Sequence, residues 1–249
     1  MTKHYTLDVE LPTKGLIYDD IPGEFTLRNI TTKEEKLIYS QNNENFMYDL
    51  VEECITEPKN VSTEELVISD TYFLLVKLRI HTYGSVYNVE HNCPQCGHKN
   101  KFKVDFDDEF QIYELEDDFE EPIFFKLPVS EDEIGIKLLR GKDIKDVDKE
   151  AQRKIRAFPN QRGDPTMEIR MKKYITHING EEVDQAIASQ YVEDGLHGRD
   201  SAYFWHKVND IDIGYDPTVI RTCENMRCGA NLEFMLPLTP EFFRPSFDD

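Results

Sequence analysis

The sequence predicts an α+β fold, because strand-like and helix-like patterns of apolar residues alternate along a chain of 249 residues. Two cysteine turns, Cys93 to Gly97 and Cys223 to Gly229, recur far apart, and each is closed by glycine. A strand-like segment follows each turn, at residues 101–106 and 231–236. We therefore expect an N-terminal strand and helix lobe plus a zinc-ribbon-like element whose two knuckles are separated by a long α+β insertion.

This organisation divides the chain into three parts. Residues 1–90 form the N-terminal lobe, residues 91–106 and 219–238 form the split ribbon-like element, and residues 107–218 form the inserted strand pair and helical group. No run of about 18 apolar residues is present, and the N-terminal residues lack the apolar segment of a secretory signal. We therefore expect no membrane partner and a cytoplasmic location.

The N-terminal lobe begins with two short strands, over residues 5–9 and 24–28, which are separated by proline and glycine turns. Thr32 and Glu35 have the spacing of a capping box, which predicts a short helix that runs through Ile38.

Two further helices complete the lobe. The first has one apolar face, made by Phe46, Leu50, Val51 and Cys54. Ser62 and Glu65 repeat the capping-box spacing, and residues 70–82 are apolar on most sides before Gly84 provides a C-terminal stop. A helix that is apolar on most faces belongs in the core, so we expect this one to be the central helix of the lobe.

The net charge is strongly negative, with 29 Lys and Arg against 49 Asp and Glu, a formal charge of −20. Such a potential repels phosphate backbones, so we expect no nucleic-acid partner. Acidic residues are densest between Asp105 and Glu121. This segment is interpreted as a solvated connector, with an acidic docking strip as the alternative.

The insertion begins with two strands, at residues 122–129 and 133–139, joined by a turn at 130–132. A helix follows Gly141, with Asp143 as its cap. Its narrow apolar stripe consists of Ile144, Val147, Ala151 and Ile155. Residues 159–165 then break the pattern and are predicted to be a mobile loop that could order on binding.

A second helical face in the insertion consists of Met167, Met171, Tyr174, Ile175 and Ile178. Its last turn can become a strand, because Asn179-Gly180 is a hairpin signal. Residues 184–195 and 200–208 predict two more helices. The aromatic cluster Tyr203, Phe204 and Trp205 is interpreted as helix packing, with a partner-binding surface as the alternative.

Five cysteines are too few for a disulfide scaffold, and the cytoplasm keeps thiols reduced. Four of them lie in the two knuckles, and we predict that they bind one structural Zn²⁺: Cys93, Cys96, Cys223 and Cys228. Four protein ligands leave no position for an activated water, so the site is not catalytic. Cys54 is assigned to packing on its helix.

The long gap between the knuckles is compatible with a metal site. Closing a loop of this length costs about 4 kcal/mol, whereas a structural zinc site contributes about 10 to 16 kcal/mol in small peptides. His91 and His98 flank the first knuckle and are alternative ligands that could replace one sulfur. A redox role is disfavoured because no thioredoxin-like βαβ pattern surrounds the CxxC. The spacing does not distinguish zinc from iron.

Catalytic motifs are absent from the sequence. It contains no Walker A loop, GxSxG elbow, HExxH helix or GxGxxG turn after a strand. The seven histidines do not lie in a catalytic spacing. We therefore predict that the protein is not an enzyme.

Several motifs occur together in a characteristic order: LPTKGLIY at residues 11–18, LLVKLRI at 74–80, YG at 83–84, CPQCG at 93–97 and CENMRCG at 223–229. In an acidic chain of this length they resemble the baseplate hub assembly proteins of T-even-type contractile-tailed phages. The resemblance implies a chaperone or scaffold, made in the cytoplasm of the infected host, that binds baseplate hub proteins transiently. It supplies no active-site residues.

Two other functions remain open. One is a permanent structural part of the baseplate. The other is a nucleic-acid-binding zinc ribbon, for which the cations near the knuckles are Lys99, Lys101, Lys103, Arg221 and Arg227.

Overall fold

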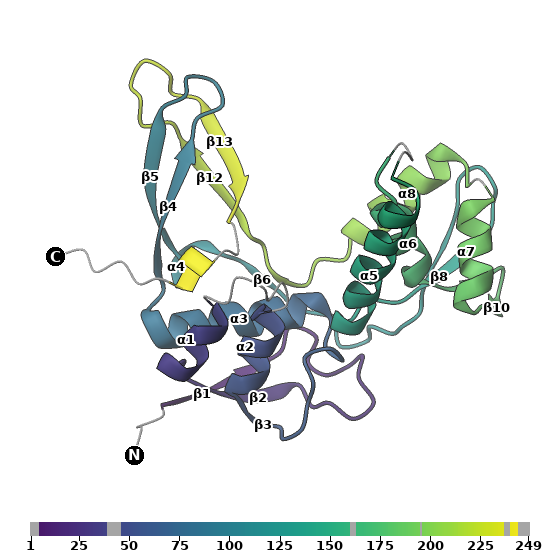
Figure 1. Cartoon of the computed structure of the whole chain (residues 1–249), viewed down its shortest axis with the longest axis horizontal. Helices are drawn as coiled ribbons and strands as arrows, with labels where there is room; N and C mark the ends of the chain where they lie inside the picture. Colours follow the sequence, from purple (N-terminus) through teal and green to yellow (C-terminus); the bar gives the residue numbers. More distant parts are fainter. Residues whose placement is uncertain (1–4, 39–45, 160–162, 195, 237–239, 244–249) are drawn as a thin grey trace.

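The computed structural model describes residues 5–38, 46–159, 163–194, 196–236 and 240–243 of the chain. The described residues form a mixed α/β structure with several small antiparallel sheets. Figure 1 shows an N-terminal region around α3, an arm of two β-hairpins that projects from it, and a separate group of helices packed with a sheet. None of the described helices is long and apolar enough to cross a membrane.

The N-terminal sheet is antiparallel and has the strand order β1-β2-β3. Its strands are β1 (Thr6–Glu10), β2 (Glu24–Arg28) and β3 (Ile55–Glu57). Two helices, α1 (Thr32–Ile38) and α2 (Phe46–Cys54), precede β3 in the chain. The predicted apolar face of α2 is confirmed, since Leu50, Val51 and Cys54 are fully buried. Cys54 therefore packs in the core, as predicted.

The cap of α1 lies one residue earlier than predicted. Thr31, rather than Thr32, accepts a hydrogen bond from the Lys33 amide at 3.4 Å, and the Glu34 carboxylate accepts from the Thr31 amide at 3.0 Å. Arg28 holds the same carboxylate through two hydrogen bonds of 3.1 Å. Thr31 with Glu34 has the same spacing as Thr32 with Glu35, and Arg28 holds the Glu34 carboxylate near Thr31.

The second predicted capping box, Ser62 with Glu65, does not begin a helix. The Glu65 amide donates to the Ser62 carbonyl at 3.0 Å and closes a turn. The Ser62 hydroxyl donates instead to the Glu52 carboxylate at 3.0 Å. Helix α3 begins only at Ile68, after Val67 has formed an isolated bridge.

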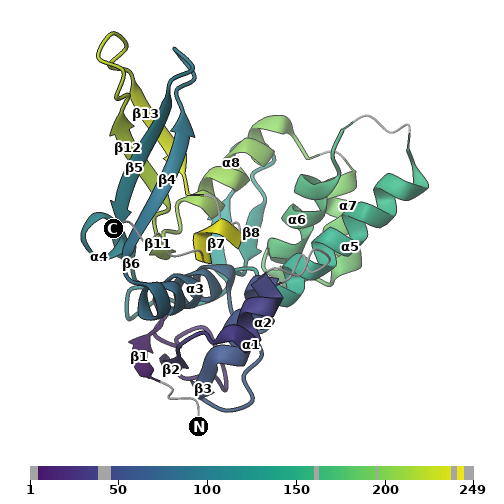
Figure 2. The same ribbon diagram turned by 60° about the vertical axis from the view of Figure 1, so that its left-hand side comes forward.

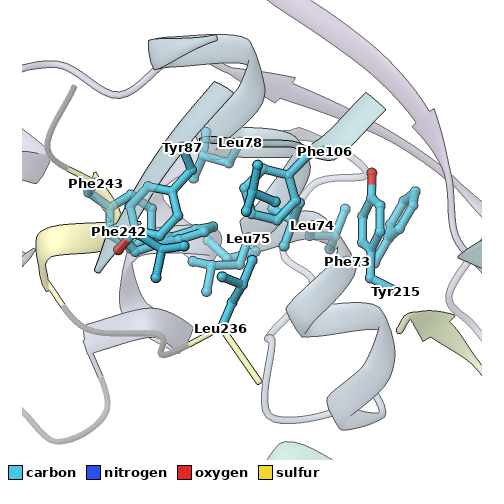
Figure 3. Packing of buried hydrophobic residues seen from close by; sticks show 14 of the residues in the cluster. Phe73, Leu74, Leu75, Leu78, Tyr87, Phe106, Tyr215, Leu236, Phe242 and Phe243 are labelled. Atoms are coloured by element: carbon cyan, nitrogen blue, oxygen red, sulfur yellow. The ribbon is translucent and has the colours of Figure 1, made fainter. Parts of the chain in front are cut away.

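Helix α3 (Ile68–Tyr83) is the central helix, as predicted, and half of its side chains are buried while the others are half-buried. Gly84 ends it at φ +90°, with its amide donating to the Ile80 carbonyl at 2.9 Å. Figure 3 shows the apolar cluster around the helix, which draws aromatic residues from distant parts of the chain. Phe242 and Phe243 of the 3₁₀ helix η1 (Pro240–Phe243) are fully buried in it.

Asp70, at the start of α3, fastens the turn after β1 to the helix. Its carboxylate accepts hydrogen bonds from the Thr13 hydroxyl at 2.5 Å and the Tyr18 hydroxyl at 2.7 Å. Burial raises the pKa of Asp70 to about 6, although these hydrogen bonds act in the opposite direction. The motif at residues 11–18 is therefore a structural anchor.

Arg79, near the end of α3, is 1% exposed and has no carboxylate partner among the described residues. Its guanidinium donates to the backbone carbonyls of Gly84, Val86 and Phe242. The side chain also lies over the ring of Phe106, with its Cζ 5.8 Å from the ring centroid. Arg79 thus joins the helix, the base of the arm and η1.

The arm consists of two antiparallel hairpins. One pairs β4 (Val86–Asn92) with β5 (Lys99–Asp105), and the other pairs β12 (Thr218–Thr222) with β13 (Asn231–Met235). The predicted strands after the two knuckles are thereby confirmed. Figures 1 and 2 both show the hairpins side by side, with the two knuckle turns together at the tip.

The acidic segment after β5 contains two short elements that the sequence did not predict. They are α4 (Phe106–Glu109) and β6 (Ile112–Tyr113), which pairs with β11 (Gly214–Tyr215). Phe106 and Leu115 are buried and anchor the segment, whereas most of its carboxylates are exposed.

The inserted part has a four-stranded antiparallel sheet in the order β10-β9-β8-β7. Its strands are β7 (Ile123–Lys126), β8 (Glu133–Ile136), β9 (Ile175–Ile178) and β10 (Glu181–Glu182). The first two are shorter than predicted. The hairpin at Asn179-Gly180 is confirmed, and both residues have positive φ.

Four helices accompany this sheet: α5 (Gly141–Ala157), α6 (Thr166–Tyr174), α7 (Gln185–Glu193) and α8 (Gly198–Asn209). The predicted stripe of α5 is correct through Ala151, but Ile155 is 52% exposed. Asp143 is the third residue of α5 and reaches back to accept from the Arg140 amide at 3.0 Å, so Arg140 occupies the cap position.

The aromatic residues of α8 confirm the packing interpretation. Phe204 is 1% exposed and makes edge contacts with Phe125 and Tyr174, at centroid distances of 5.9 Å and 6.1 Å. These residues belong to the second apolar cluster of the molecule. The centre of the predicted loop at 159–165, residues 160–162, lies outside the described residues.

Candidate metal centre

The two knuckles have matching backbone geometry. In the first, the Gly97 amide donates to the Cys93 carbonyl at 2.8 Å, and in the second the Gly229 amide donates to Asn225 at 3.2 Å. Both glycines have positive φ, +71° and +59°, a conformation that side-chain-bearing residues rarely adopt. The glycine that closes each turn therefore has a direct structural role.

The hairpins bring together all four predicted ligands. The sulfur of Cys93 lies 3.8 Å from that of Cys228, and the sulfur of Cys96 lies 3.7 Å from that of Cys223. All four sulfurs lie within 4.8 Å of one another. These separations exceed the disulfide bond length of about 2.05 Å, and the four thiols are free.

These distances fit a tetrahedral metal ion. Four sulfurs placed about 2.3 Å from a Zn²⁺ form a tetrahedron with edges of about 3.8 Å. The Cys93–Cys228 and Cys96–Cys223 sulfur separations match this edge length. Four thiol ligands are also the donor set of closed structural zinc sites.

The thiols differ in acidity. A backbone hydrogen bond from His98 lowers the pKa of Cys96 to about 7, whereas burial raises the pKa of Cys223 to about 12. Metals bind cysteine as the thiolate, so a bound cation would have to stabilise the deprotonated form of Cys223. Metal binding at the cluster would therefore release a proton from Cys223.

Asn100, which the sequence did not single out, joins the two knuckles. Its side chain is fully buried and donates to the carbonyls of His91 and His98 at 3.0 Å and 3.1 Å. Its Oδ1 accepts from the Glu224 amide of the other knuckle at 2.8 Å. The signal was present in the strand alternation, because residues 100, 102 and 104 share the inward face of β5.

Polar side chains of the second knuckle complete the surroundings of the sulfurs. The Glu224 carboxylate accepts from the Lys101 amide at 3.1 Å. The Asn225 side-chain amide lies 3.7 Å from the Cys96 sulfur, to which it donates. Hydrogen bonds of this kind orient metal ligands and stabilise thiolates.

The two flanking histidines do not belong to the cluster. The His91 ring stacks on Phe234 with a centroid distance of 4.2 Å and an interplanar angle of 6°, which packs one hairpin on the other. Over the described ranges, the group of close ligand atoms contains the four cysteines and neither His91 nor His98. The geometry thus favours four sulfur ligands over three sulfurs and one nitrogen.

Three of the cations near the knuckles are paired with carboxylates of the arm or of α4. Lys99 and Lys101 both pair with Glu90, the first at 2.5 Å. Arg221 pairs with Glu109. These pairs reduce the positive charge available to a phosphate strand.

The fold and the cysteine cluster define a mixed α/β protein with a candidate structural metal centre and no recognised catalytic motif. A protein-family model described as "T4 bacteriophage base plate protein" matches residues 2–204. The chain therefore belongs to this family of T4-type phage baseplate proteins, which indicates a structural or assembly role. No curated protein and no solved structure matches the chain.

The family match and the metal centre overlap only in part. The matched residues include Cys93 and Cys96 but end before Cys223 and Cys228. The four-cysteine site consequently depends on the geometry of the two hairpins rather than on the family match.

Proposed function

We propose that the protein is a non-enzymatic assembly factor for the central hub of a contractile phage tail baseplate. It acts as a chaperone or scaffold in the host cytoplasm, by transient binding to hub proteins. Membership of the baseplate family is the observation that carries this proposal.

The distribution of charge supports transient protein binding. Glu116, Asp118 and Glu120 are exposed, and none forms an ion pair within the described part of the chain. Free surface carboxylates accelerate encounter with a basic partner surface, and salt screens this attraction. These exposed carboxylates support the acidic docking strip, which is the alternative to a solvated connector.

Mixing the purified protein with baseplate hub components at low and high salt tests this function. We expect a complex whose affinity falls as salt is added. The double substitution Glu116→Gln with Asp118→Asn should lower this affinity further. The matched control neutralises two exposed carboxylates on β10, Glu181→Gln with Glu182→Gln, and should leave the complex unchanged. Failure to form any salt-sensitive complex would contradict the proposal.

A permanent structural role is the second candidate, because family membership is equally compatible with it. Quantitative mass spectrometry of purified virions separates the two functions. An assembly factor that acts transiently should be absent from the particle, whereas a fixed copy number would establish the structural role.

We also propose that one structural Zn²⁺ binds Cys93, Cys96, Cys223 and Cys228, forming a zinc-ribbon-like element. The metal would join the two ends of the insertion at residues 107–218 and hold the arm rigid. The proposed division of the chain depends on this role of the metal; its parts are residues 1–90, the split element and the insertion. Residues 237–238 of the split element lie outside the described residues.

Metal analysis of freshly purified protein tests the zinc site. We expect about one zinc per chain in the natural protein, and loss of the metal in Cys228→Ser. Cys54→Ala is the matched control, because it also removes one thiol but from a site in the core. Unchanged metal content and stability in Cys228→Ser would contradict the site.

A further inference from the structure

In the described part of the chain, one edge of strand β1 has no strand partner. It is the first strand of the sheet β1-β2-β3, so only β2 pairs with it among the described strands. The Asn29 amide donates to Tyr5, and the Leu11 amide donates to Gly23. Because hydrogen-bonded pairs alternate in an antiparallel ladder, the odd-numbered residues of β1 face β2.

The even-numbered residues of β1 consequently direct their backbone groups outward. Thr6, Asp8 and Glu10 make no backbone hydrogen bond to any described residue outside their own ladder with β2. An open row of amides and carbonyls is a template for another strand. The edge could therefore accept an extended peptide by strand addition.

A groove of about 420 Å³ runs beside this edge. Its floor is one face of α3, where Phe73, Lys77 and Ile80 follow each other at helical spacing. Residues 7–10 of β1 form one wall, and Ile112 of β6 belongs to the other. Figure 2 shows β1 and β6 on opposite sides of α3.

The walls of the groove converge at one end. The Leu115 amide donates to the Pro12 carbonyl at 2.9 Å, which ties the segment after β6 to the segment after β1. Apolar side chains, including Leu7 and Val9, line the groove between them. An added strand would thus find a free backbone edge and apolar contacts in the same place.

The negative charge of the groove indicates which kind of peptide it can bind. Four carboxylates line it, from Asp8, Glu10, Asp107 and Glu114, against the ammonium of Lys77, and Lys14 from outside the lining pairs with Glu114 at 3.6 Å. Lys77 lies over the rings of Phe73 and Tyr215, 5.5 Å and 5.7 Å from their centroids, and forms no ion pair with a described carboxylate. The groove therefore complements a cationic segment.

We propose that the open edge of β1 and this groove bind an extended segment of a partner protein as an added antiparallel strand, in which lysine or arginine alternates with apolar residues. Basic side chains lie opposite Asp8 and Glu10, and apolar side chains lie opposite Leu7 and Val9. The biological source of the segment, a baseplate protein, rests on the proposed function, but the groove can be tested without any such protein.

The first test uses a labelled peptide of three Lys-Val repeats and measures fluorescence anisotropy with the full chain. We expect saturable binding that salt weakens, and no binding of a Glu-Val peptide of equal length. Methylation of the lysine backbone nitrogens should abolish binding, because those amides face β1. Methylation of the valine backbone nitrogens should leave binding intact, because those amides point away from β1.

The second test uses variants of the groove. Glu10→Gln and Asp107→Asn should each weaken peptide binding about twofold to fivefold. Asp8→Asn removes only the negative charge of the side chain. Asp8→Pro also removes a backbone amide that faces outward, so this variant should bind the peptide about tenfold more weakly than Asp8→Asn does. Thermal unfolding of each variant verifies that the fold persists.

Several results would overturn this proposal. One is that the two methylated peptides bind with equal affinity, and another is that the Glu-Val peptide binds. A third is that the Lys-Val peptide does not bind at concentrations up to about 1 mM. Concentration-dependent dimerisation that Asp8→Pro abolishes would assign the edge to a second copy of the chain instead. If the peptide binds but the Asp8→Pro variant still assembles with hub components, the groove is a peptide-binding site that hub assembly does not use.

Discussion

The side chain of Asn100 provides the sharpest test of how the two knuckles are joined. Asn100→Ala removes three hydrogen bonds from a side chain that is fully buried, two to residues that flank the first knuckle and one to the second knuckle. A hydrogen bond contributes about 1 kcal/mol net to stability, so the variant should lower the free energy of unfolding of the arm by about 3 kcal/mol.

Two measurements on the zinc-loaded protein examine this prediction. Urea denaturation followed by circular dichroism gives the free energy of unfolding, and transfer of zinc to a chelator reports opening of the knuckles. Asn231→Ala is the matched control, because Asn231 begins the neighbouring strand β13 but is exposed. If Asn100→Ala and Asn231→Ala are equally stable and release zinc at the same rate, Asn100 does not join the knuckles.

Two buried polar residues of α3 give further predictions. Burial raises the pKa of Asp70 from 3.8 to about 6, so its contribution to stability is complete below pH 4 and declines by about 3 kcal/mol as the pH rises through 6. Asp70→Asn should remove this decline in urea denaturation measured between pH 4 and 7. Arg79→Leu leaves the carbonyls of Gly84, Val86 and Phe242 without their donor, and should lower the thermal unfolding midpoint by an amount equivalent to about 3 kcal/mol or more.

Local patterns predicted the elements whose signals are local. The apolar face of α2 and the hairpin at Asn179-Gly180 both appear where their spacing places them. Helix α3 is recognisable because its apolar residues cover most of its surface. Each of these signals depends on neighbours within a few residues, which the sequence contains in full.

Errors occurred where residues outside an element decide its structure. Thr31 caps α1 because Arg28 holds Glu34 in place, and Ser62 is drawn to Glu52. The two-residue strands β6 and β11 exist only because residues 112–113 and 214–215 meet in the fold. A pair of this length has no periodicity to detect.

The candidate metal centre was predictable in its ligands but not in its support. The knuckle spacing and closing glycines identified the four cysteines, whereas the joining role of Asn100 required knowledge that the second knuckle lies against the first. The open edge of β1 likewise depends on the order of strands in the sheet. In both cases the feature depends on which distant segments pair in the fold, and residue types alone do not reveal that pairing.

Zinc-edge X-ray absorption on freshly purified protein tests most directly whether four cysteines clasp the two hairpins. We predict a metal bound by four sulfur atoms at about 2.3 Å, with the same four ligands in Cys54→Ala and loss of the metal in Cys228→Ser. A shell that contains nitrogen or oxygen ligands, or protein purified without metal, would contradict this prediction.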